Sequence, residues 1–166
     1  MKSVNYENYI DEVLDIITDN GIFLTTQGEK LNTMTIGWAN FGVVWGEPIL
    51  MILVRKSRYT YKILESSDEF TVSIPQKGKM KKELMFCGSK SGKKYDKFKE
   101  CDLNKLPGQN IKTPVIGECM LHFECKIKYK QDMQGDNLVL EYKNKWYKND
   151  DFHRLYFGNI VNCYLT

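Results

Sequence analysis

The chain has 166 residues, of which 42% are hydrophobic and 27% charged, with a formal net charge of +3. This length suits one domain with its own core, and we take residues 1–166 as a single domain. The longest uncharged apolar run, from Pro48 to Val54, is too short to cross a bilayer, and the lysines are interspersed with acids and aromatics. We therefore expect neither a membrane nor a nucleic acid as partner.

The N-terminal segment lacks the layout of a secretion signal. Acidic residues lie among its apolar ones between positions 7 and 15, whereas a signal has a basic stretch followed by an apolar one. The five cysteines are odd in number and widely spaced, with no pair or histidine spacing typical of zinc. These features predict a cytoplasmic protein with reduced thiols and no metal.

The first part of the chain predicts one helix and the start of a sheet. Apolar residues spaced three and four apart predict an amphipathic helix over 5–18, which Asn20-Gly21 would end. Alternating or continuous apolar patterns then predict three strands, the first two joined by a turn at 27–29: 22–26, 31–38 and 49–54. The third strand follows Pro48 and is apolar on both faces, so it should have a neighbour on each side.

The later part predicts two short helices and more strands. Ser57 is placed to cap a helix over 58–66, and a short basic helix is expected over 79–86. Strand patterns recur in four further segments: 70–74, 117–131, 138–146 and 154–164. Closing an antiparallel sheet removes its unpaired edges. The sequence therefore predicts a mainly β fold of six or seven strands with two or three helices, arranged as a small antiparallel barrel.

Residues 54–60 bring hydroxyls and cations together where a buried strand ends and a helix begins. Free N–H groups in a first helical turn favour an anion. The hydroxyls of Ser57 and Thr60, and the guanidinium groups of Arg55 and Arg58, can donate to phosphate oxygens. A capped surface helix with solvated arginines has the same spacing, so this pattern alone leaves both interpretations open.

Residues 32–42 form a second candidate segment, in which amides, hydroxyls and small residues alternate with Trp38 on a strand that then loses its regularity. Free backbone groups there can meet a planar polar ligand. A flavin ring is such a ligand, because one side needs donors and acceptors while the other needs apolar cover. Taken singly, Trp38 is equally a core aromatic and Asn32 a turn residue.

Together the two segments resemble the flavin-reductase-like family, which includes the flavoredoxins. The resemblance rests on two motifs, Asn32-x-Met34-Thr35-x-x-Trp38 and Val54-Arg55-x-Ser57-Arg58-Tyr59-Thr60-x-x-x-Ile63, separated by Pro48 and its apolar strand. Three later features agree with it: Ser91-Gly92-x-x-x-Asp96-Lys97-Phe98, Pro114 ahead of a strand, and His153-x-x-Tyr156-x-Gly158-x-Ile160. The likeness is collinear over nearly the whole chain.

This resemblance implies an FMN-binding split β-barrel that works as a homodimer, with the flavin near the subunit interface. It implies phosphate ligands at Arg55, Ser57, Arg58 and Thr60, and a ring platform at Asn32, Met34, Thr35 and Trp38. It further implies a loop that closes the pocket through Ser91, Gly92 and Lys97, and a histidine, His153, near the nicotinamide or the flavin edge. Many members continue the first motif with small serine- or alanine-type residues, whereas this chain has Gly37–Phe41. Ala39 and Asn40 stand in place of those donors, and FMN is expected rather than FAD.

The resemblance implies an oxidoreductase in which NAD(P)H gives electrons to the flavin and the flavin gives them to an acceptor. The cofactor carries the difficult chemistry, so no side-chain nucleophile is required, and His122 is expected in a core or surface role. Two alternatives remain open. One is a flavoredoxin-type carrier with tightly held FMN and a protein redox partner, and the other is a non-enzymatic module that binds a flavin or another anion.

Overall fold

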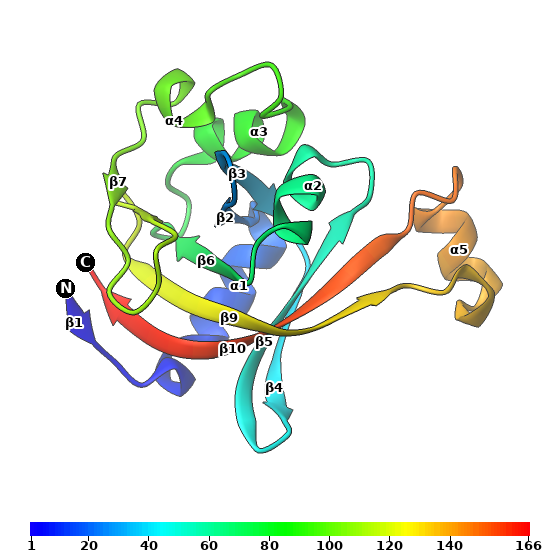
Figure 1. The fold of residues 1–166 in the computed structure, drawn as a ribbon, viewed down its shortest axis with the longest axis horizontal. Coiled ribbons are helices and arrows are strands. Elements are labelled where there is room, and N and C mark those ends of the chain that lie inside the picture. The colour runs from blue at the N-terminus through cyan, green and yellow to red at the C-terminus, as the bar shows by residue number, and fades with distance from the viewer.

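A computed structural model describes residues 1–166, and its regular secondary structure is mainly antiparallel strand (Figure 1). Seven longer strands follow one another across the main sheet in the order β3-β2-β6-β9-β10-β5-β4. Their bounds are β2 Ile22–Gln27, β3 Leu31–Ile36, β4 Ala39–Val44, β5 Glu47–Arg55, β6 Glu69–Ile74, β9 Leu121–Asp132 and β10 His153–Leu165. Two-residue strands complete the set: β1 Lys2–Ser3 pairs with β10, and β7 Lys105–Leu106 pairs with β8 Val115–Ile116. The mainly β, antiparallel fold class is confirmed.

The two edge strands of the main sheet are consecutive in the chain. Strand β3 ends at Ile36 and β4 begins at Ala39, so only residues 37 and 38 connect one edge with the other. The sheet therefore curls round on itself, and at this seam a covalent link replaces the ladder of hydrogen bonds that would close a full barrel. Trp38 lies in this seam, which is the split of the barrel.

Strand β5 lies inside the sheet, as its continuous apolar sequence predicts. It pairs with β4 on one side and β10 on the other, and Leu50, Ile52 and Val54 are fully buried. A two-residue turn, Trp45-Gly46, joins β4 to β5 with positive φ at both positions, 56° and 73°. This is the backbone shape of a type I′ hairpin turn, which glycine adopts without strain.

Two clusters of apolar side chains hold the fold together. The larger, of 20 buried residues, fills the barrel and packs the inner face of α1 (Ile10–Asp19), which follows a 3-10 turn at Tyr6–Tyr9. The smaller lies beneath α3 (Lys81–Ser89) and α4 (Lys97–Glu100). Its members are Phe23, Leu84, Cys87, Phe98, Leu103, Ile116 and Cys119. This second cluster matters for the site, because it anchors both ends of the loop between α3 and α4.

The three helices expected from the sequence are present, with α2 at Tyr59–Glu65. Two further helices raise the number of α-helices to five, above the two or three expected. One is α4, whose start is capped by Asp96 through hydrogen bonds from the N–H groups of Phe98 and Lys99. The other is α5 (Leu140–Trp146), which follows a 3-10 turn at Gly135–Asn137. None of these helices has the length and apolar composition that a membrane crossing requires.

The strand expected over 138–146 is wrong, because α5 occupies most of it. This segment leaves the barrel between β9 and β10, and Figure 1 shows it projecting from the body of the molecule, so no neighbouring strand is available to pair with it. Leu140 is 70% exposed, so its apolar side chain does not belong to a buried face of a sheet. Strand β4 is the opposite case, since the sequence suggested irregular chain after Trp38 and the structure has a regular strand from Ala39.

The remaining sequence expectations concern single residues. His122 is fully buried in β9, with hydrogen-bond contacts from its two ring nitrogens to Ser73 Oγ (3.1 Å) and Thr166 Oγ1 (2.6 Å). Its core role is therefore confirmed. All five cysteines are free thiols.

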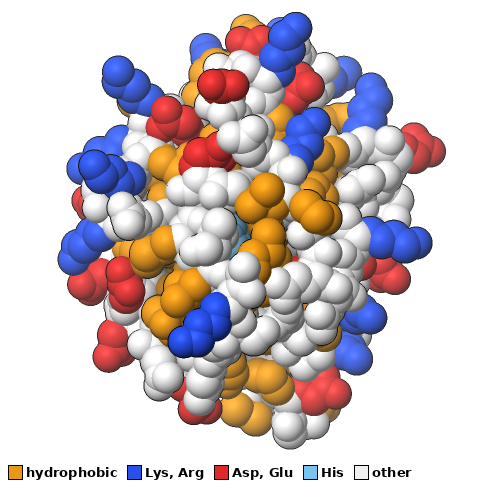
Figure 2. Space-filling view, turned by 90° about the vertical axis from the view of Figure 1, so that its left-hand side faces the viewer, with side chains coloured by type: hydrophobic (Ala, Val, Ile, Leu, Met, Phe, Trp, Pro, Cys, Tyr) orange, Lys and Arg blue, Asp and Glu red, His pale blue; other side chains and the backbone are white.

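On the side of the molecule that lies away from α5, acidic and basic side chains are interspersed around exposed apolar ones (Figure 2), so no single sign of charge dominates that side.

Candidate functional site

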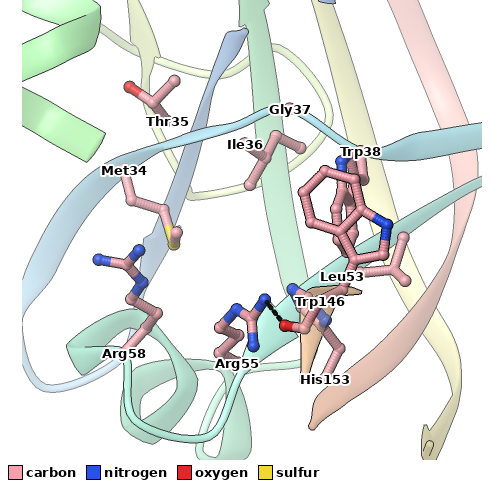
Figure 3. A pocket seen from close by; sticks show the side chains of 10 residues that line it. All are labelled: Met34, Thr35, Ile36, Gly37, Trp38, Leu53, Arg55, Arg58, Trp146 and His153. Atoms are coloured by element: carbon pink, nitrogen blue, oxygen red, sulfur yellow. Dashed lines mark hydrogen bonds between the residues drawn. The ribbon is translucent and has the colours of Figure 1, made fainter. Parts of the chain in front are cut away.

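Two adjoining hollows open at the seam of the barrel. The first, of about 200 Å³, lies between the end of β3, the strands β5 and β10, and α5; we call it the ring hollow. Figure 3 shows Met34 and Arg58 on one side of it and Trp38, Trp146 and His153 on the other. Its lining residues are Met34, Thr35, Ile36, Gly37, Trp38, Leu53, Arg55, Arg58, Trp146 and His153.

Aromatic rings form one wall of the ring hollow. The ring centroid of Trp38 lies 5.1 Å from that of Trp146, edge to face, and 5.0 Å from that of His153. The Nδ1 atom of His153 lies 2.7 Å from the hydroxyl of Tyr147. Burial, helped by the nearby charge of Arg55, lowers the pKa of His153 to about 4. The imidazole is therefore neutral at neutral pH and presents no charge to the hollow.

The second hollow, of about 130 Å³, lies between the start of α2 and the loop after α3; we call it the phosphate hollow. It shares Met34 and Arg58 with the ring hollow, so the two lie side by side. Its lining residues are Met34, Ser57, Arg58, Tyr59, Thr60, Cys87, Gly88, Ser89, Lys90, Ser91, Gly92 and Lys97. These include three cations and no carboxylate, so the charge of the hollow favours an anion.

Lys97 is the cation most firmly held there, and its side chain is almost completely buried. Its Nζ atom donates to the carbonyl oxygens of Thr33 (2.9 Å) and Cys87 (2.7 Å). Burial lowers the pKa of Lys97 to about 8, because the charged form loses its hydration. The amine is still protonated at neutral pH, and a bound anion would stabilise that charge.

The loop that closes the phosphate hollow approaches β3 so closely that position 92 needs glycine. A Cβ atom at Gly92 would overlap the side-chain oxygen of Asn32. Asn32 is itself buried and donates through Nδ2 to Thr60 Oγ1 (2.8 Å). Asn32 thus fixes the side chain of Thr60, which is one of the residues that line the hollow.

Arg55 and Ser57, two of the expected phosphate ligands, have partners in the segment before β10. Arg55 donates to the carbonyl oxygens of Asp151 (2.7 Å) and Trp146 (2.9 Å), and its guanidinium lies 4.9 Å from the ring centre of Tyr147. The hydroxyl of Ser57 donates to the Asp151 carboxylate (2.6 Å), as does its backbone N–H (3.2 Å). These bonds attach the segment to the start of α2.

The structure brings most of the expected site residues to the two hollows, although not all in the expected manner. Met34, Ser57, Arg58, Thr60, Ser91, Gly92 and Lys97 line the phosphate hollow, and Thr35, Trp38, Arg55 and His153 line the ring hollow. The hydroxyl of Thr35, however, donates to the carbonyl oxygen of Leu84 (2.6 Å). Ala39 and Asn40 lie on β4 outside both hollows, and Asn40 is exposed.

The sequence analysis missed the contribution of α5. Trp146 lines the ring hollow and Tyr147 contacts both Arg55 and His153. A signal was present, because Glu141 and Lys145 are four residues apart, as are Tyr142 and Trp146. Both spacings stabilise a helix rather than a strand.

Comparison with known proteins assigns the fold and the family. The sequence pattern described as "Flavin reductase like domain" matches residues 17–166, which is most of the chain. The chain belongs to the flavin reductase-like family. The recognition made from the sequence motifs is therefore confirmed, as is the split-barrel fold.

Relatives of this family member have diverged widely. An uncharacterized protein of Archaeoglobus fulgidus is 29% identical over 111 residues, which are 67% of this chain and 61% of the relative. The flavoredoxin of Methanosarcina acetivorans is 27% identical, with a TM-score of 0.68 over 87% of this chain and 67% of that one. The NADH:FAD oxidoreductase SgcE6 of Streptomyces globisporus C-1027 shares the fold at 17% identity, with a TM-score of 0.69 over 100% of this chain and 88% of that one.

Proposed function

We propose that this protein is an FMN-dependent oxidoreductase that takes electrons from NAD(P)H and passes them through the flavin to an acceptor. One observation carries the proposal: a hollow with an aromatic wall adjoins a carboxylate-free hollow lined by Arg58, Lys90 and Lys97. A flavin mononucleotide has this division, with a flat ring at one end and a phosphate at the other. The membership of the chain in the flavin reductase-like family supports the same conclusion.

The residues present fit that cofactor. Arg58, Thr60, Ser91 and Lys97 supply charge and hydroxyl groups for the phosphate, and Met34 lies at the passage to the ring. A flavin bound there would supply two-electron redox chemistry between a dihydronicotinamide and the acceptor. The chain itself has to orient the ring and shield one face of it from water. Trp38, Trp146 and the neutral His153 are placed to do so.

The test is an anaerobic titration of FMN-loaded protein with NADPH and with NADH. We expect the flavin absorbance band to bleach with at least one of them. Arg58→Ala should weaken FMN binding by about tenfold or more, because a charge-assisted hydrogen bond contributes about 1.5–3 kcal/mol. Retention of FMN without bleaching by either nucleotide would reject the enzyme, and no measurable FMN binding would reject the flavin site.

An electron carrier is the second candidate, and the flavoredoxin relative favours it. A carrier would hold FMN through purification and react slowly with NAD(P)H while exchanging electrons rapidly with a protein partner. Yellow protein with slow bleaching would support this function. Colourless protein that oxidises NAD(P)H only when flavin is added would support a reductase that uses flavin as a substrate.

We also propose that a second copy of the chain covers the open side of the ring hollow. Two of the apolar side chains that line it remain exposed, Trp38 at 36% and Trp146 at 42%. Burial of such rings between two copies would shield the flavin. A molar mass of a single chain by light scattering, in the presence of FMN, would contradict this.

A further inference from the structure

A third hollow lies behind the segment that joins β9 to β10. This segment, residues 133–152, contains α5, and we call it the strap. The hollow has a volume of about 370 Å³ and separates the strap from the start of α2. Its lining residues are Arg55, Arg58, Lys145, Trp146, Tyr147, Lys148, Asn149 and Asp151. It shares Arg55, Arg58 and Trp146 with the ring hollow, so the two adjoin.

The charge of this strap hollow is strongly positive. Four of its lining residues are cations, and Asp151 is the only acid among them. The carboxylate of Asp151 already accepts two hydrogen bonds from Ser57. Lys145 and Lys148 are exposed and form no salt bridge, whereas Lys143 on the same helix lies 3.9 Å from Asp150. The two free lysines leave the hollow without internal charge balance.

Aromatic groups occupy the same hollow and keep its cations in place. The ammonium group of Lys145 lies 5.1 Å from the ring centre of Trp146, and the guanidinium of Arg55 lies 4.9 Å from that of Tyr147. Both distances are those of cation–π pairs. A ligand with phosphates and a flat base would find both kinds of group here.

We propose that the strap hollow binds the adenosine phosphate end of the pyridine dinucleotide that reduces the flavin. This inference rests on the proposed function, because it places the nicotinamide in the ring hollow against the flavin. From there the pyrophosphate extends past Arg55 towards Lys145 and Lys148, while Arg58 contacts the flavin phosphate. NADH and NADPH share this chemistry, and NADPH adds one phosphate on the ribose.

The hollow is distinct from the one assigned to the flavin phosphate. The phosphate hollow contains Thr60, Ser91 and Lys97, none of which lines the strap hollow. Asp151 lines the strap hollow and lies outside the phosphate hollow. Arg58 lines both hollows, but their other cations differ, with Lys90 and Lys97 in one and Arg55, Lys145 and Lys148 in the other, so two phosphate-bearing ligands have separate cations to contact.

The same geometry gives Arg55 and Ser57 a positioning role. Both hold Asp151, and Arg55 also holds the backbone of Trp146. The bonds keep the strap close to the start of α2, so the hollow exists because these residues bind the strap. The strap is an insertion between two paired strands, so its place on the barrel depends on these contacts.

The first experiment measures binding without turnover. ADP and 2′,5′-ADP, which lack the nicotinamide, are titrated by calorimetry into FMN-loaded protein and into protein without flavin. The test variant carries Lys145→Ala and Lys148→Ala, both at exposed positions where folding is not expected to suffer. The matched control is Lys143→Ala, which removes one charge from the same helix outside the hollow.

We expect the double variant to bind ADP about tenfold or more weakly, since it loses two charge-assisted contacts, while the control and the FMN affinity stay unchanged. Tighter binding of 2′,5′-ADP than of ADP would identify NADPH as the dinucleotide that the hollow binds. The proposal is overturned if wild-type protein binds neither probe, or if Lys143→Ala weakens binding as much as the double variant does.

The second experiment separates the hollow from the flavin site by rate. Reduction is compared for NADPH, NADH and 1-benzyl-1,4-dihydronicotinamide, which carries no phosphate. In the double variant, KM should rise about tenfold for the dinucleotides while the rate with the phosphate-free donor is unchanged. Equal losses with all donors, or a parallel loss of FMN affinity, would show that the lysines serve the flavin instead. ADP binding without any FMN binding would support the strap hollow as an adenosine phosphate site and reject the proposed function.

Discussion

The two sides of the site are built by different means. On the phosphate side, Lys97 and the loop after α3 are anchored by the buried cluster beneath α3 and α4. On the strap side, Trp146 is brought to the ring hollow by Arg55 and Ser57, through hydrogen bonds to the backbone and to Asp151. Most of α5 is exposed, and none of its residues is buried.

This contrast bears on which side can vary. A loop held at both ends by packed apolar groups has one conformation, and it opens only when the core opens. A strap held by a few polar bonds can shift at little cost. We infer that the phosphate side binds the cofactor in one fixed conformation, whereas the strap side can be altered to suit a different electron donor.

The largest difference between the two sides is expected when one leucine on each side is truncated to alanine. Leu84→Ala, in the buried cluster under α3, should lower the free energy of unfolding by about 2–5 kcal/mol through lost burial and the cavity left behind. Leu140→Ala, on the exposed face of α5, should change it by less than about 0.5 kcal/mol. Urea unfolding followed by circular dichroism measures both. Similar losses in the two variants would mean that the strap is as much a part of the core as α3.

The two histidines allow a pH test of the same contrast. Burial lowers the pKa of both His122 and His153 to about 4 in the folded chain, from an ordinary 6.5. Between pH 6.5 and about 4 the unfolded chain therefore binds protons that the folded chain does not. The free energy of unfolding should fall as pH falls through this window, by up to about 1.4 kcal/mol per pH unit for each histidine, and this contribution levels off below it.

Unfolding measured at pH 7 and pH 4.5 for His122→Gln and His153→Gln gives the share of each residue. His122 is fully buried and bonded to Ser73 and Thr166, so its share should be close to the full value. His153 lies beneath the strap, and opening of the strap would let it take a proton without global unfolding, so its share should be smaller. A larger share for His153 than for His122 would contradict the expectation that the strap opens without global unfolding.

The smallest expected effect is a pH dependence of FMN affinity caused by the charge of Lys97. Its pKa is lowered to about 8, so the amine loses its charge as pH rises above that value, well before an ordinary lysine would. FMN affinity should therefore be constant between about pH 7, where the flavin phosphate is largely doubly ionised, and pH 8, and fall by at most about tenfold per pH unit above it. Fluorescence titration with FMN measures this, and Lys97→Met should bind weakly at every pH. ADP binding in the strap hollow should not follow the same profile, and if it did, the two hollows would not be independent.

Much of the site was predictable because its residues are close together in the sequence. Arg58 and Thr60 directly follow the buried strand β5, and Met34 and Trp38 lie on or just after β3. Local patterns of hydroxyls, cations and apolar strands therefore marked both segments as candidates, and the family resemblance joined them into one predicted site. Arg55 was different, since its position was predicted correctly but its partners, the backbone of Trp146 and Asp151, are more than 90 residues away.

The sequence by itself determined the antiparallel barrel, the continuous apolar strand β5 and the family, because alternation, turn residues and short motifs are local properties. Only the tertiary structure decided which partners the polar groups of the motif have, that α5 is a helix, and that Trp146 and Lys148 face α2 across a third hollow. The physical reason is that an exposed insertion has no packing face of its own, so its period says little about where it lies. Its place depends on a few long-range hydrogen bonds, and those exist only once the barrel has formed.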